Sequence, residues 1–79
     1  MQQLEDLLRF LVAGLVDDPE SVEVNGEERG TRVELTLRVA REDMGKVIGK
    51  GGRTINAIRK VMKAASVKAE RRVTVEVLD

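Results

Sequence analysis

The stretch "VIGKGGRTI", Val47 to Ile55, places three glycines and a lysine between apolar residues. Gly49 and Gly52 stand where one helix is expected to end and the next to begin, and so tight a turn needs positive φ angles that glycine reaches at little steric cost. Missing side chains also let another backbone approach, and the N–H groups that start the next helix attract anions. With Lys50 at its tip, the loop predicts a phosphate-binding site.

The chain before this stretch has two kinds of periodicity. Apolar residues from Leu4 to Leu15 recur at helical spacing, and the acidic residues and proline at 17–19 are expected to stop this helix. Alternating apolar and polar residues then predict strands at 22–25 and 32–39. The intervening "NGEERG", residues 25–30, is expected to form the hairpin loop.

Two helices and a strand are predicted around and after the glycines. Asp43 is expected to cap a short helix reaching Ile48, and a longer helix runs to about Ser66. Its buried stripe is expected to comprise Ile55, Ile58, Val61, Met62 and Ala65. Alternation at 73–77 predicts a closing strand. The order α-β-β-α-α-β over residues 1–79 predicts one α+β domain, a three-stranded mixed sheet with helices on one face.

The composition excludes several classes of function. The 79 residues include no cysteine and no histidine, which removes disulfides and the usual thiolate and imidazole nucleophiles, bases and metal ligands. We therefore expect no cofactor, no metal and no catalysis. The acidic, amphipathic N-terminus and the lack of a long apolar window predict a cytoplasmic protein without membrane insertion.

Charge is distributed unevenly along the chain. Residues 1–40 carry four basic and nine acidic residues, a net charge of −5, whereas residues 41–72 carry ten basic and three acidic residues, a net charge of +7. The glycine stretch lies within the basic part. Such a local field favours an anionic partner, although a solvated charged surface explains most charge runs as well.

Three kinds of phosphate-binding loop compete for this stretch. A P-loop needs four residues between glycine and G-K-[ST], but Gly45 to Gly49 encloses three, and Gly51 replaces the hydroxyl residue. A dinucleotide fingerprint needs a glycine where Thr54 stands and should follow a strand. Both fail on spacing and context.

The third alternative is a resemblance to a known family. "VIGKGGRTINAI" resembles the core of the KH domain, V-I-G-x-x-G-x-x-I-x-x-I, and meets it at every named position. The element order is similar to a type II KH domain, and the chain length with "DDPESVEV" resembles the small bacterial KhpA family of single-KH-domain RNA-binding proteins. The resemblance implies that Gly49, Lys50, Gly51 and Gly52 clamp about four nucleotides of single-stranded RNA. Bases would lie in an apolar groove between the first core helix, with Val47 on its flank, and the second strand.

Other basic and polar residues lie close to the loop in sequence. Lys46, Arg53, Asn56 and Arg59 are expected to add phosphate or base contacts, whereas Lys60 and Lys63 are interpreted as a solvated face. For Gly45, a helix interior, close packing and a flexible entry all remain open. Phe10, the only aromatic residue, is expected at the core edge, with a partner contact as the alternative. With one Phe and no Tyr or Trp, the chain cannot build an aromatic stacking platform. We therefore expect weak, salt-sensitive binding with low sequence preference.

A protein-interaction subunit is the main rival function. The KhpA resemblance implies self-association and partnership with a larger KH-containing protein of the Jag family, in post-transcriptional regulation and cell-envelope growth. Ala57, Val61 and Ala64 form a small-residue flank where a second helix is expected to approach as a dimer surface, and packing on the sheet explains the same residues equally well. Single-stranded DNA also remains an alternative ligand, because a backbone clamp discriminates poorly.

Overall fold

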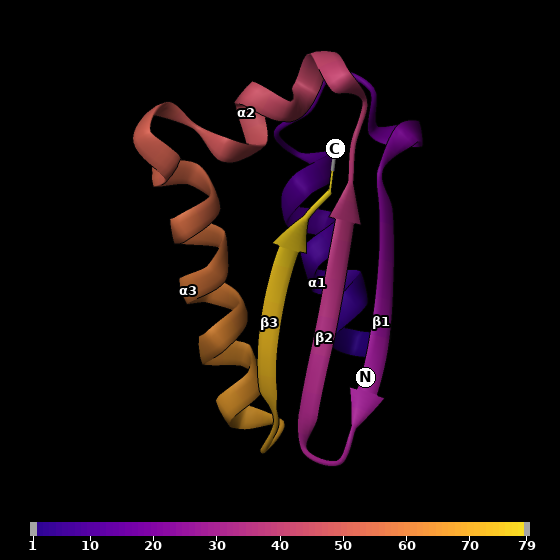
Figure 1. Cartoon of the computed structure of the whole chain (residues 1–79), viewed down its shortest axis with the longest axis vertical. Coiled ribbons are helices and arrows are strands. Elements are labelled where there is room, and N and C mark those ends of the chain that lie inside the picture. Colours follow the sequence, from indigo (N-terminus) through magenta and orange to yellow (C-terminus); the bar gives the residue numbers. More distant parts are fainter. Residues whose placement is uncertain (1, 79) are drawn as a thin grey trace.

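The computed structural model describes residues 2–78 and contains three α-helices and three strands in this part of the chain (Figure 1). They are α1 (Gln2–Ala13), β1 (Glu23–Arg29), β2 (Arg32–Arg38), α2 (Met44–Ile48), α3 (Arg53–Lys68) and β3 (Arg72–Val77), with single 3-10 turns at 19–21, 41–43 and 50–52. The expected α-β-β-α-α-β order is confirmed. Within residues 2–78, no helix combines the length and apolar character needed to cross a bilayer.

The sheet is mixed, with strand order β1-β2-β3. β1 and β2 form an antiparallel hairpin, and β2 and β3 run parallel. A parallel pair needs a long crossover, which α2 and α3 supply. In this strand order β3 is an edge strand. Figure 1 shows α3 running along that side of the sheet, with the α2–α3 loop at the end of α3 opposite the start of β3.

Helices cover one face of the sheet. The inward residues of β2, Val33, Leu35 and Leu37, are at most 1% exposed, and they pack against apolar stripes of α1 and α3. Those stripes consist of Leu4, Leu8 and Val12 on α1, and Ile55, Ile58 and Met62 on α3. Because side chains alternate along a strand, the opposite sheet face carries the polar residues of all three strands and stays open.

The first helix is shorter than the periodicity predicted. It ends at Ala13, where the Leu15 N–H turns back to the Val12 carbonyl (2.9 Å), so Leu15 lies outside the helix and is 40% exposed. Gly14 is a poor helix former and follows the last helical residue, well before the acidic residues expected to stop the helix. Phe10 is 75% exposed, so its expected place at the core edge is wrong.

The hairpin loop is also shorter than expected. β1 continues to Arg29, and only Gly30 and Thr31 connect it to β2, with Gly30 at φ 62°. The asparagine and two glycines of residues 25–30 suit the positive φ angles of a loop, and they predict one there, but residues 25–29 belong to β1. Their backbone nevertheless pairs with residues 32–36 of β2, and this pairing leaves no trace in hydrophobic periodicity.

Candidate nucleic-acid interface

The glycine loop is a compact turn between α2 and α3. Gly49, Gly51 and Gly52 have φ angles of 77°, 65° and 80°, which few residues other than glycine adopt. The Gly49 N–H donates to the Gly45 carbonyl (2.9 Å), and the Gly52 N–H donates to the Gly49 carbonyl (3.1 Å). Lys50 is exposed at the tip and has no ion pair with any residue in 2–78.

Close packing against Thr54 fixes the first glycine of the loop. A Cβ atom on Gly49 would lie 2.7 Å from both the Cβ and the backbone nitrogen of Thr54, and closer still to its hydroxyl oxygen. The same atom on Gly51 would meet nothing within 4 Å, and on Gly52 only Asn56, at 3.7 Å. Gly49 therefore serves packing as well as conformation, whereas Gly51 leaves open space above the loop.

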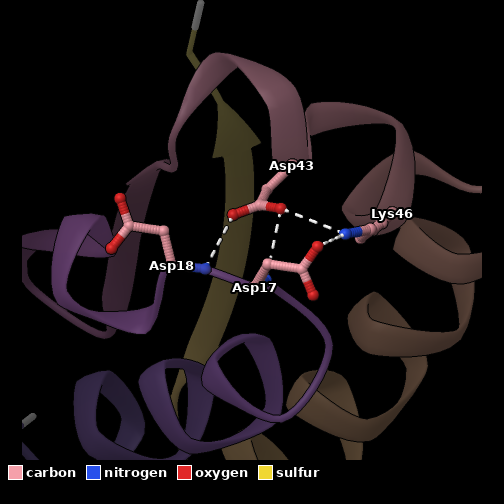
Figure 2. Close-up of polar contacts among 4 residues, drawn as sticks. All are labelled: Asp17, Asp18, Asp43 and Lys46. Atoms are coloured by element: carbon pink, nitrogen blue, oxygen red, sulfur yellow. Dashed lines mark hydrogen bonds and ion pairs between the residues drawn. The ribbon is translucent and has the colours of Figure 1, made fainter.

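Asp43 anchors α2 to the loop that precedes β1 (Figure 2). Its side chain is buried, and its two carboxylate oxygens accept hydrogen bonds from the backbone N–H groups of Asp17 (3.2 Å) and Asp18 (3.1 Å). Asp43 stands at the N-cap position of α2, as expected, but its side chain makes no capping bond to that helix. Sequence alone could not reveal these bonds, since nothing in it links Asp43 to residues 25 and 26 positions away.

Lys46 completes the anchor. Its ammonium group donates to carboxylate oxygens of Asp17 and of Asp43 (3.4 Å for the latter). Burial raises the pKa of Asp43, but hydrogen bonds from the Asp17 and Asp18 amides and the charge of Lys46 outweigh burial and lower it overall. Hydrogen bonding to Asp17 raises the pKa of Lys46. Much of the Lys46 charge is therefore engaged within the protein.

Val47 lies in the core. It is fully buried, while its neighbours Met44 and Ile48 are only partly buried, so Val47 supports α2 from beneath instead of lining a groove. A depression of about 350 Å³ does lie between the start of α2 and the end of β2, with Val39 and Met44 in its wall. Val47 contributes nothing to that depression.

A longer basic groove lies between α3 and the edge strand β3. Its first section, about 350 Å³, is lined by Arg59, Lys63, Val73, Thr74 and Val75. The Arg59 guanidinium donates from Nε (3.2 Å) and Nη2 (3.1 Å) to the Val75 carbonyl, which holds the side chain across the groove and satisfies an edge carbonyl of β3. Lys63, interpreted from sequence as a solvated face, is part of this wall.

The remaining expected contacts lie on the exposed surface near the loop. Arg53 and Asn56 occupy the first turn of α3, and both are exposed. The structure thus brings Lys50, Arg53 and Asn56 together at one end of α3 and places Arg59 about one turn beyond Asn56. Val47 points into the core, whereas the exposed Lys46 turns toward Asp17 and Asp43. Gly45 is exposed within α2, and an added Cβ would meet nothing within 4 Å, so close packing does not explain this glycine.

The small-residue flank of α3 is exposed. Ala57, Val61 and Ala64 are all exposed, and Val61 retains 45% of its surface, so its expected place in the buried stripe is wrong. Met62 and Ser66 are buried in that stripe. Packing on the sheet therefore does not explain Val61.

Known proteins resemble this chain over almost its whole length. The family model described as "KhpA/KhpB, KH domain" matches residues 5–77. Similar proteins include those named "RNA-binding protein KhpA" from Caldanaerobacter subterraneus subsp. tengcongensis, 47% identical over 92% of this chain and 97% of the relative, and from Bacillus subtilis, 45% identical over 99% and 96%.

Two solved structures share the fold. A crystal structure of Era with MgGDPNP and nucleotides 1506–1542 of 16S ribosomal RNA aligns with a TM-score of 0.65 and 21% identity, over 94% of this chain and 28% of that one. A crystal structure of an Aquifex aeolicus Era variant bound to GDP.AlF4- aligns with a TM-score of 0.66 and 22% identity, over 95% and 29%. At such low identity these likenesses concern the fold alone. The family match and the KhpA relatives, in contrast, show that this chain belongs to the KhpA/KhpB KH-domain family.

Proposed function

We propose that this domain binds single-stranded RNA with low sequence specificity and holds its sugar-phosphate backbone at the loop formed by Gly49, Lys50, Gly51 and Gly52. The observation that carries the proposal is the loop itself: three glycines with positive φ, open space above Gly51, and an exposed Lys50 that forms no ion pair within residues 2–78. The relatives named as RNA-binding proteins support the choice of ligand.

Residues near the loop and residues of the α3–β3 groove would contact different parts of the RNA. Arg53 and Asn56 lie beside the loop and would contact the same phosphates or the first base. The α3–β3 groove would receive the bases, with Arg59 and Lys63 in its wall. In this proposal Lys46 and Val47 act indirectly, because they fix the position of α2.

Contacts to the RNA backbone predict how binding depends on salt and on RNA sequence. Without an aromatic platform, affinity rests on charge and on apolar contact, so it falls steeply with salt and depends little on sequence. This suits a cytoplasmic protein that acts on many RNAs in post-transcriptional regulation, including regulation of cell-envelope growth. Catalysis forms no part of the proposal.

A titration of short labelled RNA tests whether the loop of residues 49–52, called the clamp below, holds the RNA backbone. The Lys50→Asp, Gly51→Asp double variant should bind a single-stranded 4-mer at least about tenfold more weakly than the wild type, because it places two carboxylates where phosphates are held. Aspartate tolerates positive φ better than most residues, which limits damage at Gly51. Fluorescence anisotropy measures affinity, and circular dichroism checks the fold.

A control variant matches the change in charge. Gln3→Asp with Arg9→Asp also lowers the net charge by 3, on exposed positions of α1, and should bind RNA like the wild type. If both variants lose affinity equally, only the general field matters and the clamp is refuted. Equal binding by the loop variant and the wild type would refute it too. Single-stranded DNA of the same sequence measures the discrimination between the two nucleic acids.

A second candidate function rests on exposed apolar residues. Val61 and Phe10 are 45% and 75% exposed, and Ala57 and Ala64 beside Val61 would let another helix approach closely. We propose this flank of α3 as a dimer surface, used for a homodimer or for a heterodimer with a larger KH-containing protein of the Jag family. Protein pairing would then be the main role of the domain.

A further inference from the structure

A row of three arginines crosses the open face of the sheet at its hairpin end. In the strand register Arg29 lies opposite Arg32, and Arg32 lies opposite Arg72; all three are exposed. Like charges directly opposite each other on a sheet are destabilising. The stability of the fold therefore does not explain why three arginines lie side by side. Binding of an anionic ligand would explain the row.

Two of these arginines have no partner in the described chain. Arg29 is paired with Glu27 (3.1 Å), but no side-chain hydrogen bond or ion pair within residues 2–78 engages Arg32 or Arg72. The next row of the sheet contains Glu27 and Glu34. The positive strip is consequently one row wide and is bounded by carboxylates.

The basic groove leads to this row. A second section, about 680 Å³, is lined by Arg32, Lys63, Ser66, Val67, Arg71, Arg72, Val73 and Thr74, and it shares Lys63, Val73 and Thr74 with the first section. Among the described residues, no carboxylate lines either section. Arg71 is held in place by Glu28 (2.9 Å) and by the Gly30 carbonyl (3.0 Å). The groove thus turns around the start of β3 from the helix side to the open face of the sheet.

We infer that a bound RNA strand follows this groove away from the glycine loop and that Arg32 and Arg72 bind its phosphates on the open face. This inference rests on the proposed function, and it adds a second backbone site beyond the loop. Figure 1 places the glycine loop and the start of β3 at opposite ends of α3. A helix of 16 residues is about 24 Å long, whereas four stacked nucleotides span on the order of 10 Å, so a strand longer than four nucleotides is needed to reach both sites.

The shape of the strip favours RNA over an acidic protein. A single line of phosphates fits a strip one row wide between carboxylates, whereas a protein surface would also have to cover Glu27 and Glu34. Arginine also presents a planar fork of donors that matches phosphate oxygens.

Oligonucleotide length provides the test. The Arg32→Gln, Arg72→Gln double variant should bind a single-stranded 12-mer about tenfold more weakly than the wild type, while its affinity for a 4-mer changes less than about twofold. Loss of two phosphate contacts should lower the slope of log K against log salt by about 1.4 for the 12-mer. Arg9→Gln with Arg38→Gln removes the same charge away from the groove and should bind both lengths like the wild type.

Each outcome separates this inference from the clamp. If the arginine variant binds the 12-mer as the control does, the second site is refuted, and the clamp still stands if the Lys50 and Gly51 variant loses binding to the 4-mer. If the wild type binds neither length, both proposals fail. An acidic 12-residue oligoglutamate whose binding depends on Arg32 and Arg72, with 12-mer RNA unaffected by these substitutions, would assign the row to a protein partner and overturn the inference.

Discussion

A buried carboxylate, that of Asp43, holds the helix that leads into the glycine loop. Each of its oxygens accepts one backbone N–H, from Asp17 and from Asp18, and Lys46 balances the charge. A carboxylate can satisfy both donors, but an asparagine has one oxygen and an NH2 group that would face the second N–H. Position 43 therefore requires an acid and not merely a polar residue of that shape.

Asp43→Asn should lower the melting temperature by about 5 °C or more, because one backbone N–H loses its partner and Lys46 loses a counter-charge. It should also weaken RNA binding, since α2 positions the loop. Thermal unfolding followed by circular dichroism measures the first effect. Asp18→Asn is the matched control, because the Asp18 backbone makes the bond to Asp43 and its exposed side chain does not. Equal melting temperatures for the wild type and Asp43→Asn would contradict the anchor.

The same contacts make stability depend on pH in a defined direction. The pKa of Asp43 is lower in the folded protein than its ordinary value of 3.8, so the folded state binds this proton less readily than the unfolded state does. The stabilisation is complete well above that ordinary value and is lost as the pH falls through it toward the lowered folded pKa. The stability difference between the wild type and Asp43→Asn should be constant near neutral pH and shrink below about pH 4. If the stability difference between the two proteins stayed constant down to about pH 2, the carboxylate of Asp43 would not be the cause of the pH dependence.

At the scale of elements, Gly45 inside α2 and Gly49 directly after it have opposite roles. Gly49→Ala should destabilise the protein by about 2 kcal/mol or more, because alanine at positive φ is strained and its Cβ would collide with Thr54. Gly45→Ala should stabilise it by about 0.5–1 kcal/mol, because the site is helical and its surroundings are open. Urea denaturation of both variants measures the difference. Destabilisation by Gly45→Ala would mean that this glycine has a structural role in α2 not visible in its surroundings.

Elements with a strong apolar pattern were predictable, and those held by polar backbone contacts were not. The helical spacing of Ile55, Ile58 and Met62 predicted that these residues are buried on α3, and the glycines predicted a loop between two helices. The second half of β1 escaped prediction because pairing with β2, not apolar side chains, makes it a strand. The place of Arg59 and Lys63 in the wall of the α3–β3 groove was not predicted either, because periodicity cannot tell which flank of α3 faces β3.

At the scale of the whole molecule, α3 separates two proposed interfaces. Val61 and Val67 are six residues apart, which places them about 120° apart around the helix. Val61 belongs to the exposed small-residue flank, whereas Val67, 68% exposed, lines the second section of the basic groove. RNA and a partner helix would therefore occupy different sides of α3, and both could be bound at once.

This separation predicts opposite effects for two chemically identical substitutions. Val61→Asp should convert a dimer to a monomer, because it places a charge in an apolar contact, and should leave the affinity for a 4-mer unchanged within about twofold. Val67→Asp should leave the oligomeric state unchanged and weaken 12-mer binding several-fold, because its carboxylate would face phosphates in the groove. Sedimentation velocity over a concentration series and anisotropy titrations measure the two properties. If the wild type is already monomeric throughout the series and no KH-containing partner distinguishes it from Val61→Asp, the dimer surface is wrong. If instead each substitution changes both properties, the two interfaces overlap, and RNA and partner binding would compete for one side of α3.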